Sequence, residues 1–242
     1  LGVTMRGVPD LIRAEADALS TYLNEARTYA TALPDTFTAT DAAAGVFRNA
    51  AKGIADAPVN DLVRERVESV ESGISGLTSL RERIRSSASQ PAPAEAAYSA
   101  ILNDLLGMGR EVANVVQDRE LGTYLTAYVS MQGLIEAVRI EELYVEREIR
   151  QGYWVIGEVA QFQEYYFGSN NALDLATQAM AVIPDAPTVP EFGASYDGVT
   201  LIGYETIRDR LFNDPTADAL LDHRSSEWSL QVEEELAVYQ PM

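Results

Sequence analysis

A run of charged residues between Arg139 and Arg150 interrupts the apolar pattern of a long helical segment. Glu142 lies on the apolar face, where a charge needs a partner because burying an unpaired charge is costly. Arginines and carboxylates in this arrangement could pair with one another, or an arginine could hold a bound anion. The apolar face recurs at steps of three and four, the period of an α-helix, at Leu121, Tyr124, Tyr128, Met131, Ile135, Val138, Val145 and Ile149.

Two arginines of this run have a carboxylate one helical turn away, and a third does not. Arg139 precedes Glu142 by three residues, and Glu146 precedes Arg150 by four, so both pairs can form along one helix. Arg147 points toward a second apolar face. We expect its partner to come from another helix or to be a bound anion. Its neighbours one turn away are Leu143, Tyr144, Arg150 and Gln151.

The composition excludes several classes of function. The net charge of −19 argues against nucleic-acid binding, because no basic patch offsets it. The chain has no cysteine and only one histidine, His223, which argues against metal centres and Ser-His-Asp catalysis. We expect no cofactor and no metal. The sequence contains no apolar run of membrane-spanning length, so we expect no membrane insertion by this chain. The ends at Leu1 and Met242 lie in or near helical sequence, which favours a fragment of a longer protein.

The pattern predicts an all-α protein, because no region alternates polar and apolar residues long enough for a sheet. The segment around 119–167 is apolar on two faces, which is typical of a helix between neighbours. We therefore predict two packed antiparallel four-helix bundles sharing or flanking that helix. They form one domain, with halves 1–117 and 118–242. The remaining helices are expected near 8–33, 40–56, 58–86, 95–116, 172–182, 200–212 and 215–239.

Local signals set the expected helix ends. Pro34 is expected to end the first helix, and Thr40-Asp41 to cap the second. Asp118 is expected to cap the long helix, and the break after it is expected at Gly168-Ser-Asn-Asn171. Residues 87–94 are predicted to form a linker, because they are small and rich in proline.

Several short motifs occur in a fixed order along the chain. The segment from Glu141 to Arg147 contains a Glu-x4-Glu-Arg pattern on the long helix. With the others, it resembles the nitrate- and nitrite-sensing (NIT) domain family of bacterial receptors over nearly the whole chain. The others are Ala18-Leu19-Ser20-x-Tyr22, Thr40-Asp41, Leu77-x-x-Leu-Arg81, Tyr98-x-x-Ile-Leu102 and the segment from Asp222 to Trp228. This chain departs from the family pattern at two places. The family usually has Glu-Arg where this chain has Ala16-Asp17, and it has an arginine where this chain has Phe37.

The resemblance implies a sensor made of two four-helix bundles, in which arginines bind a small anion between helices and the helices then rearrange. The anion would be nitrate, nitrite or a small carboxylate. The expected ligand contacts are Arg147, Arg81, Arg139 and Tyr144. The resemblance also implies an extracytoplasmic domain of a transmembrane receptor, a sensor histidine kinase above all, that works as a homodimer and is not itself an enzyme.

A second interpretation is a ligand-free helical interaction or scaffolding domain. In it, Asp17 and Arg147 form a structural salt bridge between helices, and an exposed face binds a partner protein. A third, an enzyme, is the least supported, because the sequence lacks a nucleophile–base pair, metal-ligand spacing and a phosphate-binding loop.

Overall fold

The computed structural model describes residues 12, 15, 33–55, 59–86, 91–154, 157–190, 195–196, 199–200, 202–216 and 225–239. This part of the chain is helical apart from turns and one hairpin of two short strands, which confirms the all-α fold class. The chain divides into two compact units, Leu1–Leu125 and Thr126–Met242.

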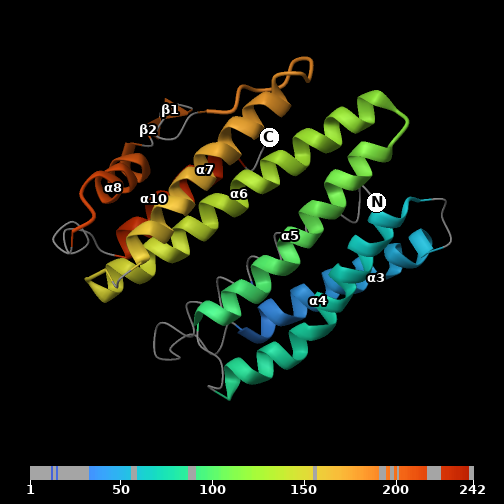
Figure 1. The fold of residues 1–242 in the computed structure, drawn as a ribbon, viewed down its shortest axis with the longest axis horizontal. Coiled ribbons are helices and arrows are strands. Elements are labelled where there is room, and N and C mark those ends of the chain that lie inside the picture. Colours follow the sequence, from blue (N-terminus) through green and yellow to red (C-terminus); the bar gives the residue numbers. More distant parts are fainter. Residues whose placement is uncertain are drawn as a thin grey trace. The chain divides into compact units, whose positions relative to one another are not determined.

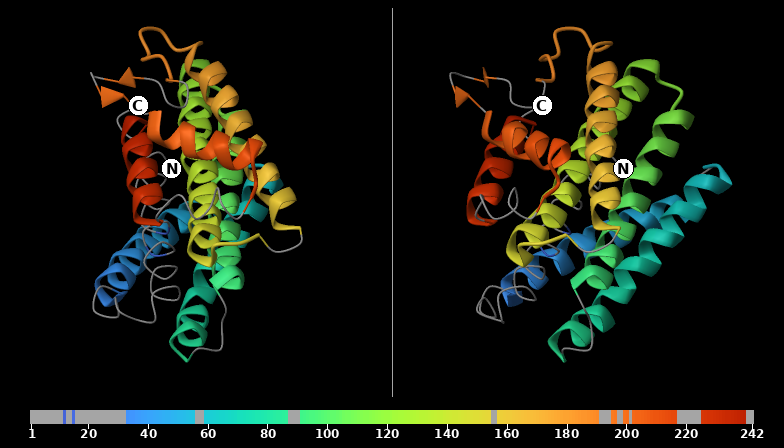
Figure 2. Two further views of the ribbon diagram at one scale, coloured as in Figure 1. Left: turned by 90° about the vertical axis from the view of Figure 1, so that its left-hand side faces the viewer. Right: turned by 60° about the vertical axis from the view of Figure 1, so that its left-hand side comes forward.

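The first unit contains α3 (Leu33–Ala55), α4 (Asp61–Arg85) and α5 (Pro91–Val115). Helices α4 and α5 run antiparallel and lie side by side (Figures 1 and 2). The side chain of Asn60 caps α4 by accepting a hydrogen bond from the backbone N–H of Val63 at 2.9 Å. The buried face of α4 recurs at helical spacing, as the sequence predicts, at Val63, Val67, Val70, Ile74, Leu77, Leu80 and Ile84.

The second unit is built around most of α6 (Arg119–Gln151), which begins within the first unit. Next come α7 (Glu158–Met180), the antiparallel strands β1 (Ser195–Tyr196) and β2 (Val199–Thr200), α8 (Ile202–Asn213) and α10 (Ser225–Tyr239). Helix α7 runs back alongside α6 (Figure 2). Trp228 of α10 is fully buried, and its indole N–H donates to the backbone oxygen of Glu142 at 3.0 Å. It therefore anchors the last helix, as the sequence predicts.

The long helix ends earlier than the sequence predicts. It stops at Gln151 instead of continuing to Phe167, and Gly152 and Gly157 both adopt positive φ angles, of 73° and 94°. The expected break at 168–171 was wrong, because α7 runs through it. Ser169 Oγ and Asn170 Nδ2 donate to the backbone oxygen of Tyr166 instead of ending the helix.

Two other predicted boundaries were also wrong, and one was confirmed. The Thr40 hydroxyl donates to the backbone oxygen of Thr36 inside α3, so Thr40-Asp41 does not begin a helix. Pro34 is the second residue of α3, and the end of the predicted first helix before it lies outside the described residues. The linker predicted at 87–94 extended too far, because α5 begins at Pro91. Proline is well suited to the first turn of a helix. Asp118 caps α6 as predicted, with Oδ1 accepting from the backbone N–H groups of Glu120 and Leu121 at 3.0 and 3.1 Å.

Several sequence-based predictions lie outside the described residues. They include the predicted first helix apart from residues 12 and 15, the motif at 18–22, Asp17, and residues 222–224 with His223. Helix α10 is described from Ser225 to Tyr239. The prediction of a single domain with halves at 117/118 stays a prediction.

Replacing Gly157 with alanine is expected to lower the free energy of unfolding by about 1–2 kcal/mol, because an alanine at positive φ is strained. No atom lies within 4 Å of the added methyl group, so the loss would be conformational. Gly168→Ala is the matched control. It lies within α7, also meets no atom within 4 Å, and should stabilise the helix by about 0.5–1 kcal/mol. Chemical denaturation followed by tryptophan fluorescence measures both. A neutral Gly157→Ala would contradict the assigned turn.

Candidate functional site

The second half of α6 buries an unusual number of carboxylates. Four of its glutamates are at most 5% exposed, namely Glu136, Glu141, Glu142 and Glu148. Because a buried charge is costly unless it is paired or neutralised, their partners decide what this part of the molecule can do.

Glu141 is neutralised by an arginine that the sequence pattern did not reveal. The Arg208 Nε atom of α8 donates to Glu141 Oε1 at 2.7 Å, and both side chains are at most 2% exposed. Ser169 of α7 donates to Glu141 Oε2 at 2.5 Å and accepts from Arg208 Nη2 at 2.8 Å. The Arg208 guanidinium carbon lies 4.0 Å from the centre of the Tyr166 ring. This cluster of three helices satisfies its own charges and needs no ligand.

Arg147 has a partner on its own helix, so the expectation that none would be found there was wrong. Its Nε and Nη2 atoms both donate to Oε1 of the adjacent Glu148, at 3.0 and 2.9 Å. Glu158, at the start of α7, lies 4.0 Å from Nη2. Side chains one residue apart diverge by about 100° on a helix, but the long arginine side chain bends far enough to reach its neighbour. The guanidinium carbon stacks 4.5 Å from the centre of the Tyr144 ring.

Glu148 is the most perturbed carboxylate of this cluster. Its side chain is fully buried, and Oε2 has no hydrogen-bond partner among the described residues. Burial raises the pKa of Glu148 to about 7, the nearby Glu158 contributes in the same direction, and the Arg147 charge opposes them. A carboxyl group in these surroundings exchanges its proton near neutral pH.

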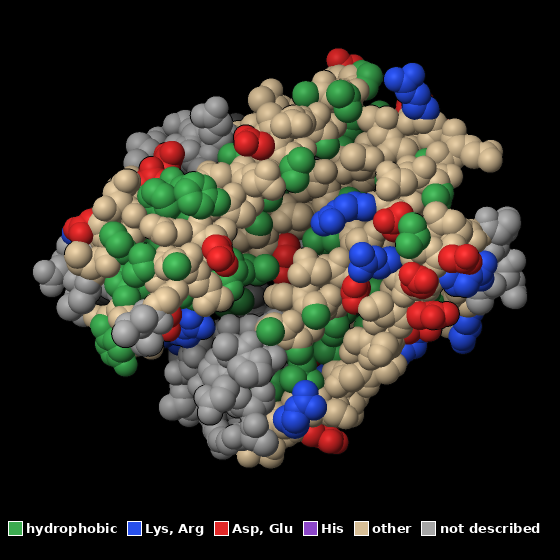
Figure 3. All heavy atoms as spheres, in the orientation of Figure 1, with side chains coloured by type: hydrophobic (Ala, Val, Ile, Leu, Met, Phe, Trp, Pro, Cys, Tyr) green, Lys and Arg blue, Asp and Glu red, His purple; other side chains and the backbone are tan. Residues whose placement is uncertain are grey.

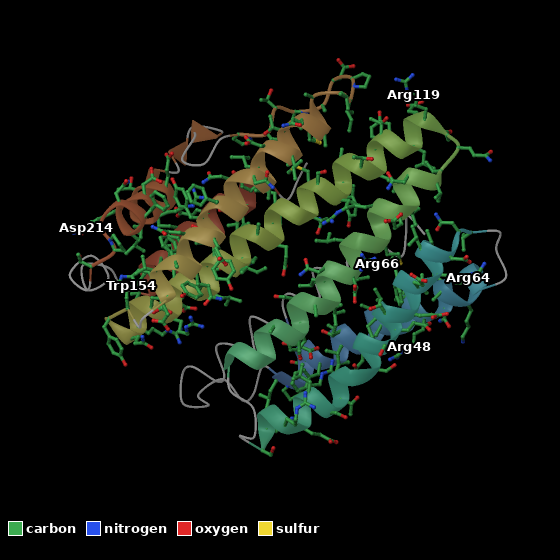
Figure 4. All side chains as sticks on the ribbon, viewed as in Figure 1. Arg48, Arg64, Arg66, Arg119, Trp154 and Asp214 are labelled. Carbon is green, nitrogen blue, oxygen red and sulfur yellow. The ribbon has the colours of Figure 1, made fainter. Side chains whose placement is uncertain are left out.

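Tyr144 connects the Arg147 cluster to the turn between α6 and α7. Its hydroxyl donates to the backbone oxygen of Glu158 at 2.8 Å, and its ring packs edge-on against Tyr165 at 5.0 Å between centres. Burial raises the pKa of Tyr144, so its hydroxyl keeps its proton. Trp154 lies in the same turn, between the end of α6 and the start of α7 (Figure 4). The Tyr144 ring therefore holds the Arg147 guanidinium near the turn between α6 and α7.

The two ion pairs predicted along α6 are confirmed. Arg139 Nη1 lies 2.9 Å from Glu142 Oε2, and Arg150 Nη2 lies 2.5 Å from Glu146 Oε1. The Arg139 pair explains how Glu142 can occupy a buried position. Arg139 is thus placed with Glu142, away from the Arg147–Glu148 contact.

Arg81, in the first unit, belongs to a different cluster. Its Nε and Nη2 atoms donate to the two carboxylate oxygens of Glu15 at 2.7 and 2.6 Å, and Nη1 donates to Asp41 at 2.7 Å. The Tyr98 hydroxyl donates to Glu15 Oε1 at 2.5 Å. Glu15 is fully buried, whereas the Asp41 side chain is 63% exposed. The carboxylate fork of Glu15 matches the guanidinium as a bound oxyanion would.

Phe37 faces the Arg81 guanidinium, with 4.6 Å between the arginine carbon and the ring centre. Arg85 lies over the same ring at 5.0 Å. Burial alone would lower the pKa of Arg81, but the hydrogen bonds and charges of Glu15 and Asp41 outweigh it and raise that pKa. Arg81 therefore stays charged and is held by carboxylates of the protein itself.

The structure brings two of the four predicted ligand contacts together, Arg147 and Tyr144. Arg139 pairs elsewhere on α6, and Arg81 lies in the first unit. Sequence reasoning missed Glu148, Glu158 and Arg208. Glu148 carried a signal, because it directly follows Arg147. Arg208 carried none, because 67 residues separate it from Glu141.

On the face shown in Figure 3, acidic and basic side chains of the described residues are interspersed. Within the described ranges, no helix is both long and apolar enough to cross a membrane. The same residues contain no group of three or more Asp, Glu or His side chains arranged to hold a metal ion.

Comparison with known proteins finds a family model that matches the sequence and a solved structure with a similar fold. A family model described as "nitrate and nitrite sensing" matches residues 12–197. A solved structure of the NasR transcription antiterminator has a similar fold, with a TM-score of 0.74 and 14% sequence identity. That match covers 98% of this chain and 64% of the NasR chain, so this chain spans less than two thirds of that protein. No curated protein matches the sequence.

Proposed function

The chain belongs to the nitrate- and nitrite-sensing family, and from that premise we propose that its second unit binds a small anion at the Arg147 guanidinium. The observation that carries the proposal is the position of this side chain. It is partly open to solvent, it is stacked on Tyr144, and it has a perturbed carboxylate beside it. A planar guanidinium held in this way offers paired donors to nitrate, nitrite or a small carboxylate.

Exposure favours Arg147 over the two other arginines in carboxylate clusters. Its side chain is 29% exposed, whereas those of Arg81 and Arg208 are 8% and 2% exposed. A ligand can approach Arg147 without opening a core. Arg81 and Arg208 are themselves buried, so an anion could reach either guanidinium only if the packing around it opened.

The position of the site supports a signalling role. Arg147 lies one turn before the end of α6, and Tyr144 bonds to the first residue of α7. An anion that draws Arg147 away from Glu148 would change the contacts at the turn between these helices. Binding would then favour one packing of α6 against α7, and a ligand shifts an equilibrium by its difference in affinity for the two states.

We propose, as a wider setting, an extracytoplasmic domain of a transmembrane receptor that works as a homodimer, with a histidine kinase as the attached output. The absence of cysteine, the single lysine and the acidic composition support this setting. An antitermination output is the competing setting, because NasR shares the fold. Flanking gene sequence decides between them. Apolar segments of about 20 residues on both sides would support the receptor, and an RNA-binding domain would contradict it.

The ligand-free scaffold is the second candidate, and one observation favours it: Arg147 already contacts Glu148. In that case the cluster is structural and added anions have no effect. The Asp17–Arg147 salt bridge of this hypothesis involves a residue outside the described ranges.

Replacing Arg147 with alanine is expected to weaken nitrate or nitrite binding by about 10- to 100-fold, because a hydrogen-bonded charge contributes roughly 1.5–3 kcal/mol. Isothermal titration calorimetry with nitrate, nitrite, formate and acetate measures the change. Arg150→Ala is the matched control, since this arginine lies three residues further on α6 and pairs with Glu146. It should change affinity by less than about threefold. If no anion binds, or if Arg147→Ala binds as tightly as the parent, the proposed site is wrong.

A further inference from the structure

We propose that Glu148 is an internal counter-ion that the ligand replaces, so that this domain takes up one proton at the Glu148 carboxyl group with each anion it binds. The inference rests on the proposed function, because it concerns the anion site at Arg147. Anion binding would then depend on the proton concentration as well as on the anion concentration, so the domain would respond to both.

The ligand and Glu148 would compete for the same hydrogen-bond donors of Arg147. Arg147 directs Nε and Nη2 at a single oxygen of Glu148. An oxyanion bound side-on to a guanidinium uses a pair of neighbouring N–H groups in the same way. Glu148 Oε1 and the ligand therefore compete for this edge, and binding releases the Glu148 carboxylate from its arginine.

The carboxylate released from Arg147 would remain buried without a compensating charge. The side chain is fully buried, and Oε2 has no hydrogen-bond partner among the described residues. A buried charge that loses its partner typically costs about 3–5 kcal/mol. Protonation removes the charge, so the neutral acid is the form compatible with a bound anion.

The charges around Glu148 also favour its protonation when an anion is bound. Arg147 and Tyr144 face this group from α6, Glu158 approaches from α7, and Tyr165 of α7 packs against the Tyr144 ring. If the ligand, Glu148 and Glu158 were all ionised, three negative charges would surround one guanidinium. Glu158 is closer to solvent than Glu148, with 20% of its side chain exposed, so Glu148 is the carboxylate that gives up its charge.

The direction of the pH dependence follows from these contacts. Burial and Glu158 raise the pKa of Glu148 to about 7 even with Arg147 in contact. Loss of that contact raises the pKa further, because the arginine charge favours the ionised form. Below about pH 6 the carboxyl group is mostly protonated before binding. Above about pH 7 it must take up a proton on binding, and affinity falls as the pH rises.

Titration of the full 242-residue chain with potassium nitrate tests the inference. Calorimetry at pH 8 in two buffers with different ionisation enthalpies counts the protons taken up. The expected result is close to one proton per nitrate at pH 8 and close to none at pH 5.5. Between pH 7 and pH 9 the dissociation constant should rise by about 50-fold in all, and its slope should approach tenfold per pH unit above pH 8.

Two variants separate Glu148 from the other carboxylates. Glu148→Gln keeps the shape and an oxygen acceptor, so it should bind nitrate with no proton uptake, show a flat pH profile and bind more tightly than the parent at pH 8. Glu146→Gln is the control from the same helix, and it should retain the parent pH profile. If Glu148→Gln does not fold, the proton count on the parent chain decides alone.

The outcomes distinguish the two proposals. Absence of nitrate binding at any pH, or binding that survives Arg147→Ala, overturns the proposed function. Binding that requires Arg147 without proton uptake at pH 8 overturns only the role of Glu148. An unchanged pH profile in Glu148→Gln overturns it as well.

Discussion

Replacing Arg208 with methionine is expected to lower the free energy of unfolding of the second unit by about 3–5 kcal/mol. The change leaves Glu141 fully buried without its 2.7 Å arginine contact. Ser169 remains as a donor to Glu141, but a hydroxyl carries no compensating charge. Methionine approximately fills the volume of the arginine stem, so the loss comes mainly from the uncompensated charge.

Tryptophan fluorescence during chemical denaturation suits this measurement, because both tryptophans, Trp154 and Trp228, lie in the second unit. Arg210→Met is the control. It lies two residues further along α8, is exposed, and should change stability by less than about 0.5 kcal/mol. A second change, Glu141→Gln in the Arg208→Met background, should recover part of the loss. Equal stability of Arg208→Met and Arg210→Met would show that the buried pair contributes little.

The contrast between the Arg208 and Arg147 clusters explains how one helix can carry both structure and a site. Glu141 and Glu148 are seven residues apart on α6, two helical turns, and both are fully buried. Arg208 comes from another helix and is itself buried, so its pair is closed. Arg147 is partly exposed and shares its charge between Glu148 and Glu158. Only the second arrangement would let the proposed ligand exchange with a carboxylate of the protein.

The sequence predicted contacts where geometry is local. Arg139–Glu142 and Glu146–Arg150 follow from the spacing of side chains on any α-helix, and both are present. Arg147 was singled out correctly as lacking a carboxylate one turn away, but its partner is the next residue. The spacing rule describes which side chains share a face, and a long flexible side chain can depart from it. Glu141–Arg208 depends on the packing of α6 against α8, which one sequence does not specify.

The helix boundaries also depend on packing that one sequence does not specify. Gly152 and Gly157 end one helix and begin the next through positive φ angles, whereas Gly168 lies within α7 with ordinary helical neighbours. The sequence presents all three as glycines in helical surroundings. Ser169 and Asn170 looked like breakers, yet their side chains bond to the Tyr166 backbone oxygen and Ser169 also holds Glu141. Tertiary packing therefore decides which polar residues end a helix.

Replacing Arg81 with methionine is expected to destabilise the first unit by about 3–5 kcal/mol. Glu15 is fully buried and receives two hydrogen bonds from Arg81 and one from Tyr98. Among the described residues, the variant would leave this carboxylate with the Tyr98 hydroxyl as its only hydrogen-bond donor. Far-ultraviolet circular dichroism during denaturation reports this change, since the first unit contains no tryptophan.

Two further variants make the Arg81 prediction specific to the buried carboxylate. Tyr98→Phe removes one hydrogen bond to a charged acceptor and should cost about 1.5–3 kcal/mol. Asp41→Asn removes the exposed partner of Arg81 and should cost less than about 1 kcal/mol, because solvent screens that pair. The expected order of losses is Arg81→Met, then Tyr98→Phe, then Asp41→Asn, which follows the burial of the groups left without partners. A larger loss for Asp41→Asn than for Tyr98→Phe would contradict this order. Asp41 rather than Glu15 would then be the main stabilising partner of Arg81, and the Glu15 carboxylate would not take the place of a bound anion at that guanidinium.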